Sequence, residues 1–331
     1  MGVELDSVVS TESAQRNPGT PPKLTVRVGV GLNPFAGSGL ADGSFWTAVE
    51  AMEELGYDSI WLSDTAALGG LAPLPALAAI AMRTERLKLG TSVLVLPPRN
   101  PVLVARELAT IDALSGGRLL PAGGLGIDVP SEIEAMGVRR DERAARLAES
   151  IALIKALWSG EPTTVRGRFW SVTELQLTPT PTRKKLEFWL GGRAPAALRR
   201  VGELADGWLS SAVAPDEFPG MVATIRAAAA EANRTIDEDH YGATVFSTPA
   251  EEEITPDIAR RLALRRGLAR EDYLARGTGE LRTLLDRFRA GGASKFVVVP
   301  VAGDLPAWLG ELYREVIAPI EAADVSGVGG A

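Results

Sequence analysis

The chain has 331 residues, of which 46% are hydrophobic and 23% charged, the composition of an ordinary globular protein with a substantial core. Its formal net charge is −7, from 42 acidic and 35 basic side chains, which argues against a nucleic-acid partner because phosphate binding needs clustered positive charge. The absence of cysteine excludes disulfides and thiolate chemistry, and a single histidine excludes a metal site built from several histidines, so no metal site is expected.

The first 22 residues are rich in Ser, Thr, Pro and Gly, and we expect residues 1–22 to form a disordered tail. The first residues include the acidic Glu4 and Asp6 and lack the basic-then-apolar pattern of a secretion signal. No apolar run approaches the roughly 20 residues that a membrane span needs. These features favour a cytoplasmic protein without a membrane partner.

From Leu24 onward, short apolar runs alternate with amphipathic helices, which is typical of parallel strands joined by helical crossovers. In the first half of the chain, Asn100 and Pro101 predict a helix start, as N-cap and first helical residue. Pro121 falls inside the fourth predicted strand, where it removes a ladder donor and predicts a bulge. The strands predicted here cover residues 26–32, 59–63, 87–96 and 118–125.

The second half of the chain repeats this alternation. A long helix is predicted over 139–158, and residues 166–177 look like an inserted strand or hairpin after the fourth barrel unit. A final helix carries Leu305, Trp308 and Leu312 on one face. The strands predicted here cover residues 186–190, 207–212, 242–247 and 296–301.

Eight strands, each followed by a helix, predict an α/β fold of the (β/α)8 TIM-barrel type. The competing architecture is an open doubly wound sheet, which is disfavoured because no Gly-x-Gly-x-x-Gly follows the first strand. We therefore expect residues 23–323 to form a single barrel domain and residues 324–331 to form a flexible tail.

In such a barrel the functional groups stand at the carboxyl ends of the strands. The first strand opens into Asn33-Pro34-Phe35, and Asp64 ends the second strand, where it could relay a proton or cap the following segment. Gly191-Gly192 precedes a helix and is equally consistent with a phosphate cradle, to which Arg193 adds a charge, and with a plain tight turn. His240 lies before the seventh strand, at the opposite end of the barrel, and is expected to be a surface residue in a turn.

Two ordered sequence signatures resemble one known superfamily. The stretch Arg86-Leu87-Lys88-Leu89-Gly90-Thr91-Ser92-Val93-Leu94, with Arg99-Asn100-Pro101 and Leu114-Ser115-Gly116-Gly117-Arg118, is one; Trp189-Leu190-Gly191-Gly192 with Ala205-Asp206-Gly207-Trp208 is the other. Together they resemble the luciferase-like flavin and deazaflavin oxidoreductases. Ile60-Trp61-Leu62-Ser63-Asp64 is most similar to the branch that uses the deazaflavin coenzyme F420.

This resemblance implies an oxidoreductase that transfers hydride between coenzyme F420 and a small organic substrate. It implies a cis peptide bulge at Ser92-Val93, against which the deazaflavin ring leans, and a cofactor phosphate at the glycine turn. The catalytic residues would be Asp64 and Thr65, and those that bind the cofactor would be Ser92, Val93, Gly124, Leu125, Gly191, Gly192 and Arg193. Because members often dimerise through barrel helices, a homodimer is the expected assembly.

The sequence departs from the sugar-phosphate dehydrogenases of this branch in two places. Thr65 stands where those enzymes have a catalytic histidine, and Ile127 stands where an acidic residue often follows the glycine-rich turn of strand four. A sugar-phosphate substrate is therefore not expected, and the substrate stays unidentified. Two other functions are open: an FMN-dependent luciferase-like monooxygenase, and a cofactor-free barrel that acts as a binding or structural protein.

Overall fold

The computed structural model describes residues 25–32, 43–65, 70–254, 259, 262 and 267–325, and the structural statements below concern these residues. The tail predicted over residues 1–22 and the loop at Asn33-Pro34-Phe35 lie outside them. The last helix ends at Val325, so it includes the first two residues of the tail predicted over residues 324–331.

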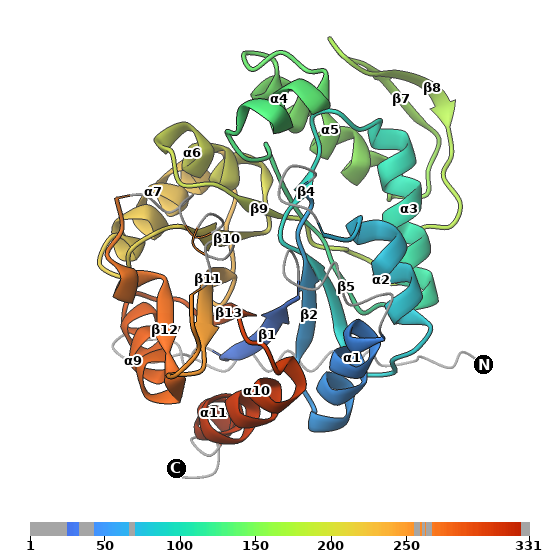
Figure 1. Ribbon diagram of the computed structural model, residues 1–331. Coiled ribbons are helices and arrows are strands. Elements are labelled where there is room, and N and C mark those ends of the chain that lie inside the picture. The colour runs from blue at the N-terminus through green and yellow to red at the C-terminus, as the bar shows by residue number, and fades with distance from the viewer. Residues whose placement is uncertain are drawn as a thin grey trace, which may run out of the picture.

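The strands form a closed ring, which confirms the predicted barrel (Figure 1). The first strand pairs in parallel with the second and with the last, and every other neighbouring pair of the ring is also parallel. The ring is closed, unlike an open sheet, because the two halves of the third barrel strand pair with the two halves of the fourth, which in turn pairs with the fifth. The ring strands are β1 (Arg27–Gly31), β2 (Ser59–Leu62), β3 (Lys88–Thr91), β4 (Leu94–Val95), β5 (Leu119–Leu120), β6 (Ala122–Gly124), β9 (Trp189–Gly191), β10 (Gly207–Ser211), β11 (Tyr241–Thr248) and β13 (Lys295–Pro300).

The third and fourth barrel strands are each broken in the middle. The peptide between Ser92 and Val93 is cis, as the resemblance implied, and separates β3 from β4; Pro121 separates β5 from β6, as its missing N–H led us to expect. At this break the hydroxyl of Thr91 donates to the carbonyl of Ala122 at 2.7 Å and accepts from its N–H at 2.8 Å. A side chain thus replaces the ladder bonds that the backbone does not make.

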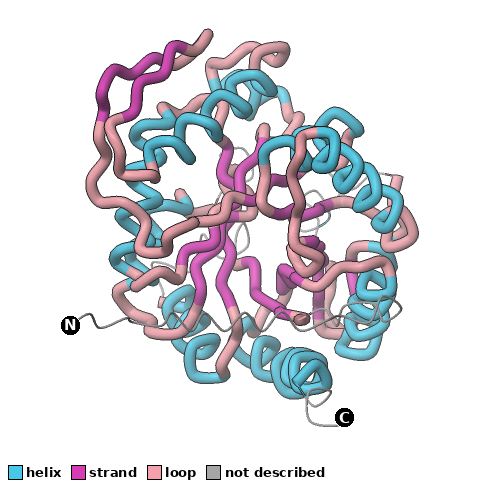
Figure 2. The backbone as a smooth tube through the Cα atoms, turned by 180° about the vertical axis from the view of Figure 1, so that it is seen from behind, coloured by secondary structure: helices cyan, strands magenta, loops and turns pink. Residues whose placement is uncertain are grey.

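Helices surround the ring, as the view from behind also shows (Figure 2). The main core lies between these helices and the outer faces of the strands, and Val28, Ile60 and Leu89 are among its fully buried residues. The helices are α1 (Ser44–Leu55), α2 (Pro73–Ala81), α3 (Pro101–Leu114), α4 (Pro130–Met136), α5 (Arg143–Leu157), α6 (Pro195–Leu204), α7 (Phe218–Glu231), α9 (Gly277–Ala290), α10 (Leu305–Leu312) and α11 (Ala318–Val325), with a π-helical turn at Tyr313–Ile317 between the last two.

An antiparallel hairpin of β7 (Thr163–Arg166) and β8 (Ser171–Leu175) stands outside the ring, at the upper right of Figure 1. It begins slightly earlier than the predicted segment 166–177. The carboxylate of Glu149 in α5 accepts hydrogen bonds from three consecutive backbone N–H groups of the hairpin loop, which fastens the loop to the barrel.

Three short elements were not predicted. α4 occupies the connection that follows the fourth strand, and it ends at Gly137, whose φ of 60° stops a helix, so α5 begins later than expected. β12 (Leu274–Arg276) pairs with the end of β11 after a 3-10 turn at Arg270–Asp272. Each is too short to give a clear hydrophobic period in the sequence.

Candidate functional site

A cavity of about 650 Å³ opens at the carboxyl ends of the strands. Its size is that of a pocket for a cofactor or other small molecule. It is lined by residues that end β2, β3, β6, β9 and β10. Every site residue predicted from the sequence lies in its wall: Asp64, Thr65, Ser92, Val93, Gly124, Leu125, Gly191, Gly192 and Arg193.

The Asp64 side chain is fixed by two neighbours. Its Oδ2 accepts hydrogen bonds from the backbone N–H of Val95 and from the guanidinium of Arg99, both at 3.0 Å, and the side chain is 17% exposed. Both bonds use Oδ2, so Oδ1 is the atom that can face a bound molecule. Asp64 does not cap α2, whose N-cap is Ala72, and the capping interpretation is therefore wrong for that helix.

Thr65 follows Asp64 in the cavity wall. Its Oγ1 is buried and has no hydrogen-bond partner among the described residues. A buried hydroxyl without a partner costs free energy, and a polar group of a bound molecule would remove that cost. The site therefore presents one fixed carboxylate and one unsatisfied hydroxyl side by side.

Glycines keep one wall of the cavity flat. A Cβ added to Gly124 would come within 2.6 Å of Val93, and one added to Gly191 would come within 3.3 Å of the same side chain. Val93 therefore projects into space that two strands leave open by having no side chain there. Such a flat apolar surface suits a planar ring.

The turn after β9 combines backbone, charge and a helix start. Gly192 has a φ of 120°, which a side chain rarely allows, and its carbonyl accepts a hydrogen bond from Trp208 at 2.8 Å. α6 begins at Pro195, and its first N–H groups and dipole favour an anion. Arg193 adds positive charge beside this helix start, where its Nη1 donates to the carbonyl of Ala212 at 3.1 Å.

Sequence reasoning missed a second arginine. Arg200 lies on α6 and lines the same cavity, and burial lowers the pKa of its guanidinium. It also missed three strand residues that line the cavity: Thr244, Phe246 and Val299. The predicted site residues follow the strands, whereas inward-facing positions within the last strands also reach the cavity.

His240 lies at the opposite end of the barrel, as predicted, before β11. With 15% of its side chain exposed, it is less accessible than a surface turn residue would be. It lines a smaller cavity of about 290 Å³ at the amino ends of the strands.

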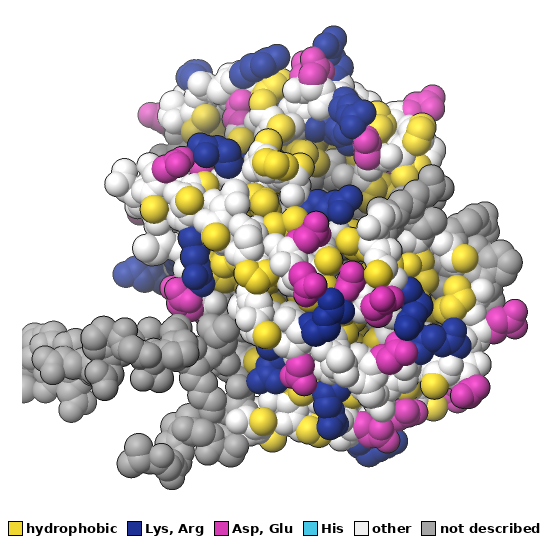
Figure 3. All heavy atoms as spheres, turned by 90° about the vertical axis from the view of Figure 1, so that its left-hand side faces the viewer, with side chains coloured by type: hydrophobic (Ala, Val, Ile, Leu, Met, Phe, Trp, Pro, Cys, Tyr) yellow, Lys and Arg dark blue, Asp and Glu magenta, His cyan; other side chains and the backbone are white. Residues whose placement is uncertain are grey.

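No described helix is long and apolar enough to cross a membrane. On the face formed by the helices at the left of Figure 1, basic and acidic side chains are interspersed (Figure 3).

Comparison with known sequences gives a family match. A model of the luciferase-like monooxygenase family matches residues 43–295. An F420-dependent glucose-6-phosphate dehydrogenase of Nakamurella multipartita is 33% identical over 231 residues, which cover 66% of this chain and 66% of that protein. One of the same name from Microbacterium testaceum is 36% identical over 169 residues, which cover 48% and 49%. The chain thus spans between about half and just under two thirds of these relatives.

Solved structures share the fold. An F420-dependent secondary alcohol dehydrogenase in complex with an F420-acetone adduct superposes with a TM-score of 0.74 at 16% identity, covering 88% of this chain and 98% of that one. The coenzyme F420 dependent tetrahydromethanopterin reductase from Methanopyrus kandleri gives 0.72 at 21% identity, covering 89% and 99%. At such low identity these likenesses establish the barrel fold alone.

Proposed function

Because the chain belongs to the luciferase-like monooxygenase family, we propose that it is an oxidoreductase that binds coenzyme F420 in the carboxyl-end cavity and exchanges a hydride with a small organic substrate. The observation that carries the proposal is the convergence of the predicted residues on one cavity. The names of the relatives above 30% identity support the choice of F420.

The residues present fit such a cofactor. Val93, with Gly124 and Gly191 leaving space around it, offers a surface for a planar ring. The Gly191-Gly192 turn with Arg193, and Arg200 farther along α6, would hold the phosphate through backbone N–H groups and positive charge. When bound, the deazaflavin supplies the hydride chemistry, which no side chain of this cavity can supply.

Asp64 and Thr65 are the groups that we assign to proton handling. Asp64 is held in place by Arg99 and Val95, so its carboxylate faces a substrate in a fixed orientation. When an alcohol carbon gives up a hydride, its oxygen loses a proton, and when a carbonyl or imine carbon receives a hydride, its heteroatom gains one. A carboxylate or hydroxyl within hydrogen-bond reach can accept or donate that proton. The unsatisfied Oγ1 of Thr65 is suited to the same atom.

We infer that the substrate is not a sugar phosphate. Thr65 occupies the position of the catalytic histidine expected in sugar-phosphate dehydrogenases, and Ile127 places an apolar side chain in the cavity wall where an acidic one often stands. Phe246 and Val299 make the deeper wall apolar as well. A small, weakly polar alcohol, ketone or imine fits this lining.

We also infer that the β7–β8 hairpin is an insertion after the fourth barrel unit, since it lies between α5 and β9 and outside the ring.

Titration of the purified full-length chain with F420 and, separately, with FMN tests the proposal. We expect saturable binding of F420, measured by quenching of its fluorescence, with at least ~10-fold weaker binding of FMN. Tighter binding of FMN would favour the monooxygenase alternative, because the glycine turn can hold the phosphate of either cofactor. Binding of neither would favour the cofactor-free barrel.

A further inference from the structure

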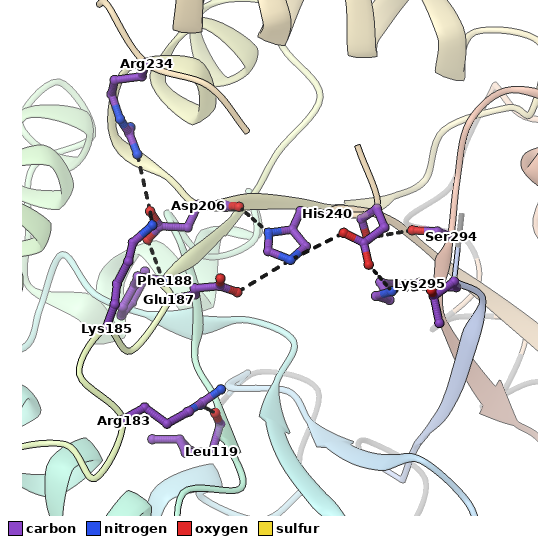
Figure 4. A network of polar contacts seen from close by, with 12 residues as sticks. Leu119, Arg183, Lys185, Glu187, Phe188, Asp206, Arg234, His240, Ser294 and Lys295 are labelled. Atoms are coloured by element: carbon purple, nitrogen blue, oxygen red, sulfur yellow. Dashed lines mark hydrogen bonds and ion pairs between the residues drawn. The ribbon is translucent and has the colours of Figure 1, made fainter. Parts of the chain in front are cut away.

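The amino end of the barrel holds a cluster of acceptor groups around the single histidine (Figure 4). Glu187 lies just before β9, Asp206 just before β10 and His240 just before β11, and these three strands are neighbours in the ring. Backbone hydrogen bonds of 2.9 Å from Asp206 to Phe188 and from Trp208 to His240 hold the three strand entrances together. The cluster is therefore built on rigid backbone.

The hydrogen bonding of His240 defines which nitrogen is free. Its Nδ1 lies 2.9 Å from the backbone carbonyl oxygen of Asp206, and a carbonyl oxygen can only accept, so Nδ1 carries the proton. In the neutral ring, Nε2 then has a lone pair and no hydrogen. Trp189 packs against the ring, with centroids 5.3 Å apart, and helps to fix its orientation. Metal-binding histidines are oriented in the same way, because the nitrogen that does not bind the metal donates its N–H to a carbonyl or carboxylate.

Carboxylates converge on that lone pair. Nε2 is 3.7 Å from Oε2 of Glu187 and 3.6 Å from Oδ1 of Asp239. A carboxylate oxygen of Asp237, one of Glu187 and a nitrogen of His240 all lie within 4.8 Å of one another. These groups are all acceptors, so their approach is unfavourable unless a proton or a cation lies between them.

The distances favour a cation over a proton. An N–H···O hydrogen bond spans about 2.7–3.2 Å, which is shorter than either approach to Nε2. Tetrahedral zinc, with ligands at about 2.0–2.2 Å, separates its ligand atoms by about 3.4 Å. Nε2 of His240 and Oε2 of Glu187 are 3.7 Å apart, and a carboxylate oxygen of Asp237 lies within 4.8 Å of both residues' ligand atoms. Lys295 compensates the charge of Asp239 through a contact of 3.0 Å, which leaves the carboxylates of Glu187 and Asp237 beside the imidazole. Their charge matches that of a divalent cation.

We propose that His240 Nε2, Glu187 and Asp237 bind one zinc-class divalent cation at the amino end of the barrel, with water completing the coordination. A site with several histidines is impossible in this chain, but one imidazole with carboxylates is an accepted ligand set for zinc. The ion joins the entrance of β9 to that of β11 across β10. Because it lies at the end of the barrel away from the cofactor cavity, its role is structural, and it is independent of the proposed function.

The test uses the untagged full-length chain, since a histidine tag would itself bind zinc. After chelator treatment and dialysis, equilibrium dialysis against micromolar zinc chloride should give one bound zinc per chain by metal analysis. Saturating zinc should raise the Tm by about 3–6 °C, because an ion that binds only the folded state stabilises it. Magnesium chloride should do neither, because magnesium prefers a set of oxygen ligands.

Three variants make the assignment specific. Asp237→Asn changes an exposed ligand and should fold normally, and His240→Asn keeps a donor for the Asp206 carbonyl. Loss of a ligand should weaken zinc binding by at least about 10–100-fold, because removing even a group that only hydrogen-bonds a metal ligand has an effect of that size. Glu238→Gln, in the same turn but paired with Arg226 at 2.7 Å, is the matched control and should bind as the parent does.

Three results would overturn the proposal. The first is substoichiometric zinc with an unchanged Tm. The second is equal zinc binding by the parent, His240→Asn and Asp237→Asn, which would assign the ion to other surface carboxylates. The third is an equal response to magnesium and zinc, which would indicate general charge screening.

Discussion

At the scale of single residues, the carboxyl-end cavity depends on what Asp64 does with its two oxygens. Oδ2 is committed to Arg99 and to the backbone of Val95, so part of the role of Asp64 is to hold the end of β4 beside the end of β2. Oδ1 is not used by these bonds. Positioning and proton transfer are therefore separable by a change that keeps the shape of the side chain and removes its charge.

We expect Asp64→Asn to lower turnover by about 10²–10⁴-fold, because general acid–base catalysis contributes that much and an amide cannot accept a proton in the same way. The measurement is kcat with a substrate found by screening for reduction of bound F420. Asp128→Asn is the control, since Asp128 lies in the same cavity wall but is exposed and paired with Arg140. Near-normal kcat for Asp64→Asn would assign the proton to Thr65 or to water.

Gly191 tests whether the turn after β9 holds the cofactor. A Cβ there meets Val93 at 3.3 Å, which small shifts can absorb, but the branches of valine would enter the cavity. We expect Gly191→Val to weaken F420 binding by ~10-fold or more, with a Tm close to that of the parent. Gly279→Val, at an exposed position with open space around it, is the control. Unchanged affinity in a folded Gly191→Val protein would mean that the turn is only structural.

At the scale of elements, the break in strands three and four is closed by one hydroxyl. Thr91 is fully buried and serves both the N–H and the carbonyl of Ala122. We expect Thr91→Val to lower the free energy of unfolding by about 1–3 kcal/mol, because it leaves two buried backbone groups unpaired. Urea unfolding measures this. Thr110→Val, whose hydroxyl bonds its own helix on the surface, should change stability by no more than about 0.5 kcal/mol; equal effects would contradict the bridging role.

The sequence predicted the elements that have a clear period or a strong stop signal. Alternating apolar runs located the ring strands, and Asn100-Pro101 correctly located the start of α3, where Asn100 accepts from Val102. Pro121 correctly indicated an interruption. α4 and β12 were missed because they have too few residues for a period, and β12 depends on its pairing with the end of β11. Inward-facing Phe246 and Val299 were missed because single-sequence patterns do not reveal how deep a cavity extends between strands.

The two ends of the barrel differ in what their polar groups do. At the carboxyl end, Thr65 has an unsatisfied hydroxyl, and the glycines of β6 and β9 leave space for a ligand. At the amino end, Arg118 directs its guanidinium to backbone carbonyls of the preceding unit, and Asp206 joins three basic side chains to the strand entrances. In barrels of this kind the first end carries function and the second carries stability. Variants at the two ends should therefore affect different measurements.

Asp206 makes this division testable through pH. Its side chain is 6% exposed, lies 2.6 Å from Lys155 Nζ and accepts the N–H of Phe188 at 2.9 Å. Burial alone would raise the pKa of Asp206, but the hydrogen bonds from Lys155 and Phe188 and the nearby positive charges together hold that pKa below its ordinary value. Burial also lowers the pKa of Lys155, yet at acidic pH this lysine stays protonated whether the chain is folded or not, so only the carboxylate titrates there.

A carboxylate whose pKa is lower in the folded chain stabilises it above the unfolded pKa of about 3.9, and this contribution disappears as pH falls through the folded pKa. We therefore expect Asp206→Asn to lower the free energy of unfolding at pH 7 by about 3 kcal/mol, since it leaves the Lys155 ammonium with the carbonyl of Leu204 but without a carboxylate. The difference from the parent should shrink steadily below pH 4. Urea unfolding at pH 7, 4 and 3 measures it, with Asp216→Asn as the control because that side chain is 88% exposed.

F420 affinity at pH 7 should be unchanged, as Asp206 lies at the amino end. A difference that stays constant down to pH 3 would mean that Asp206 stabilises the barrel through packing and hydrogen-bond geometry, and a loss of F420 affinity in the folded variant would contradict the division between the two ends.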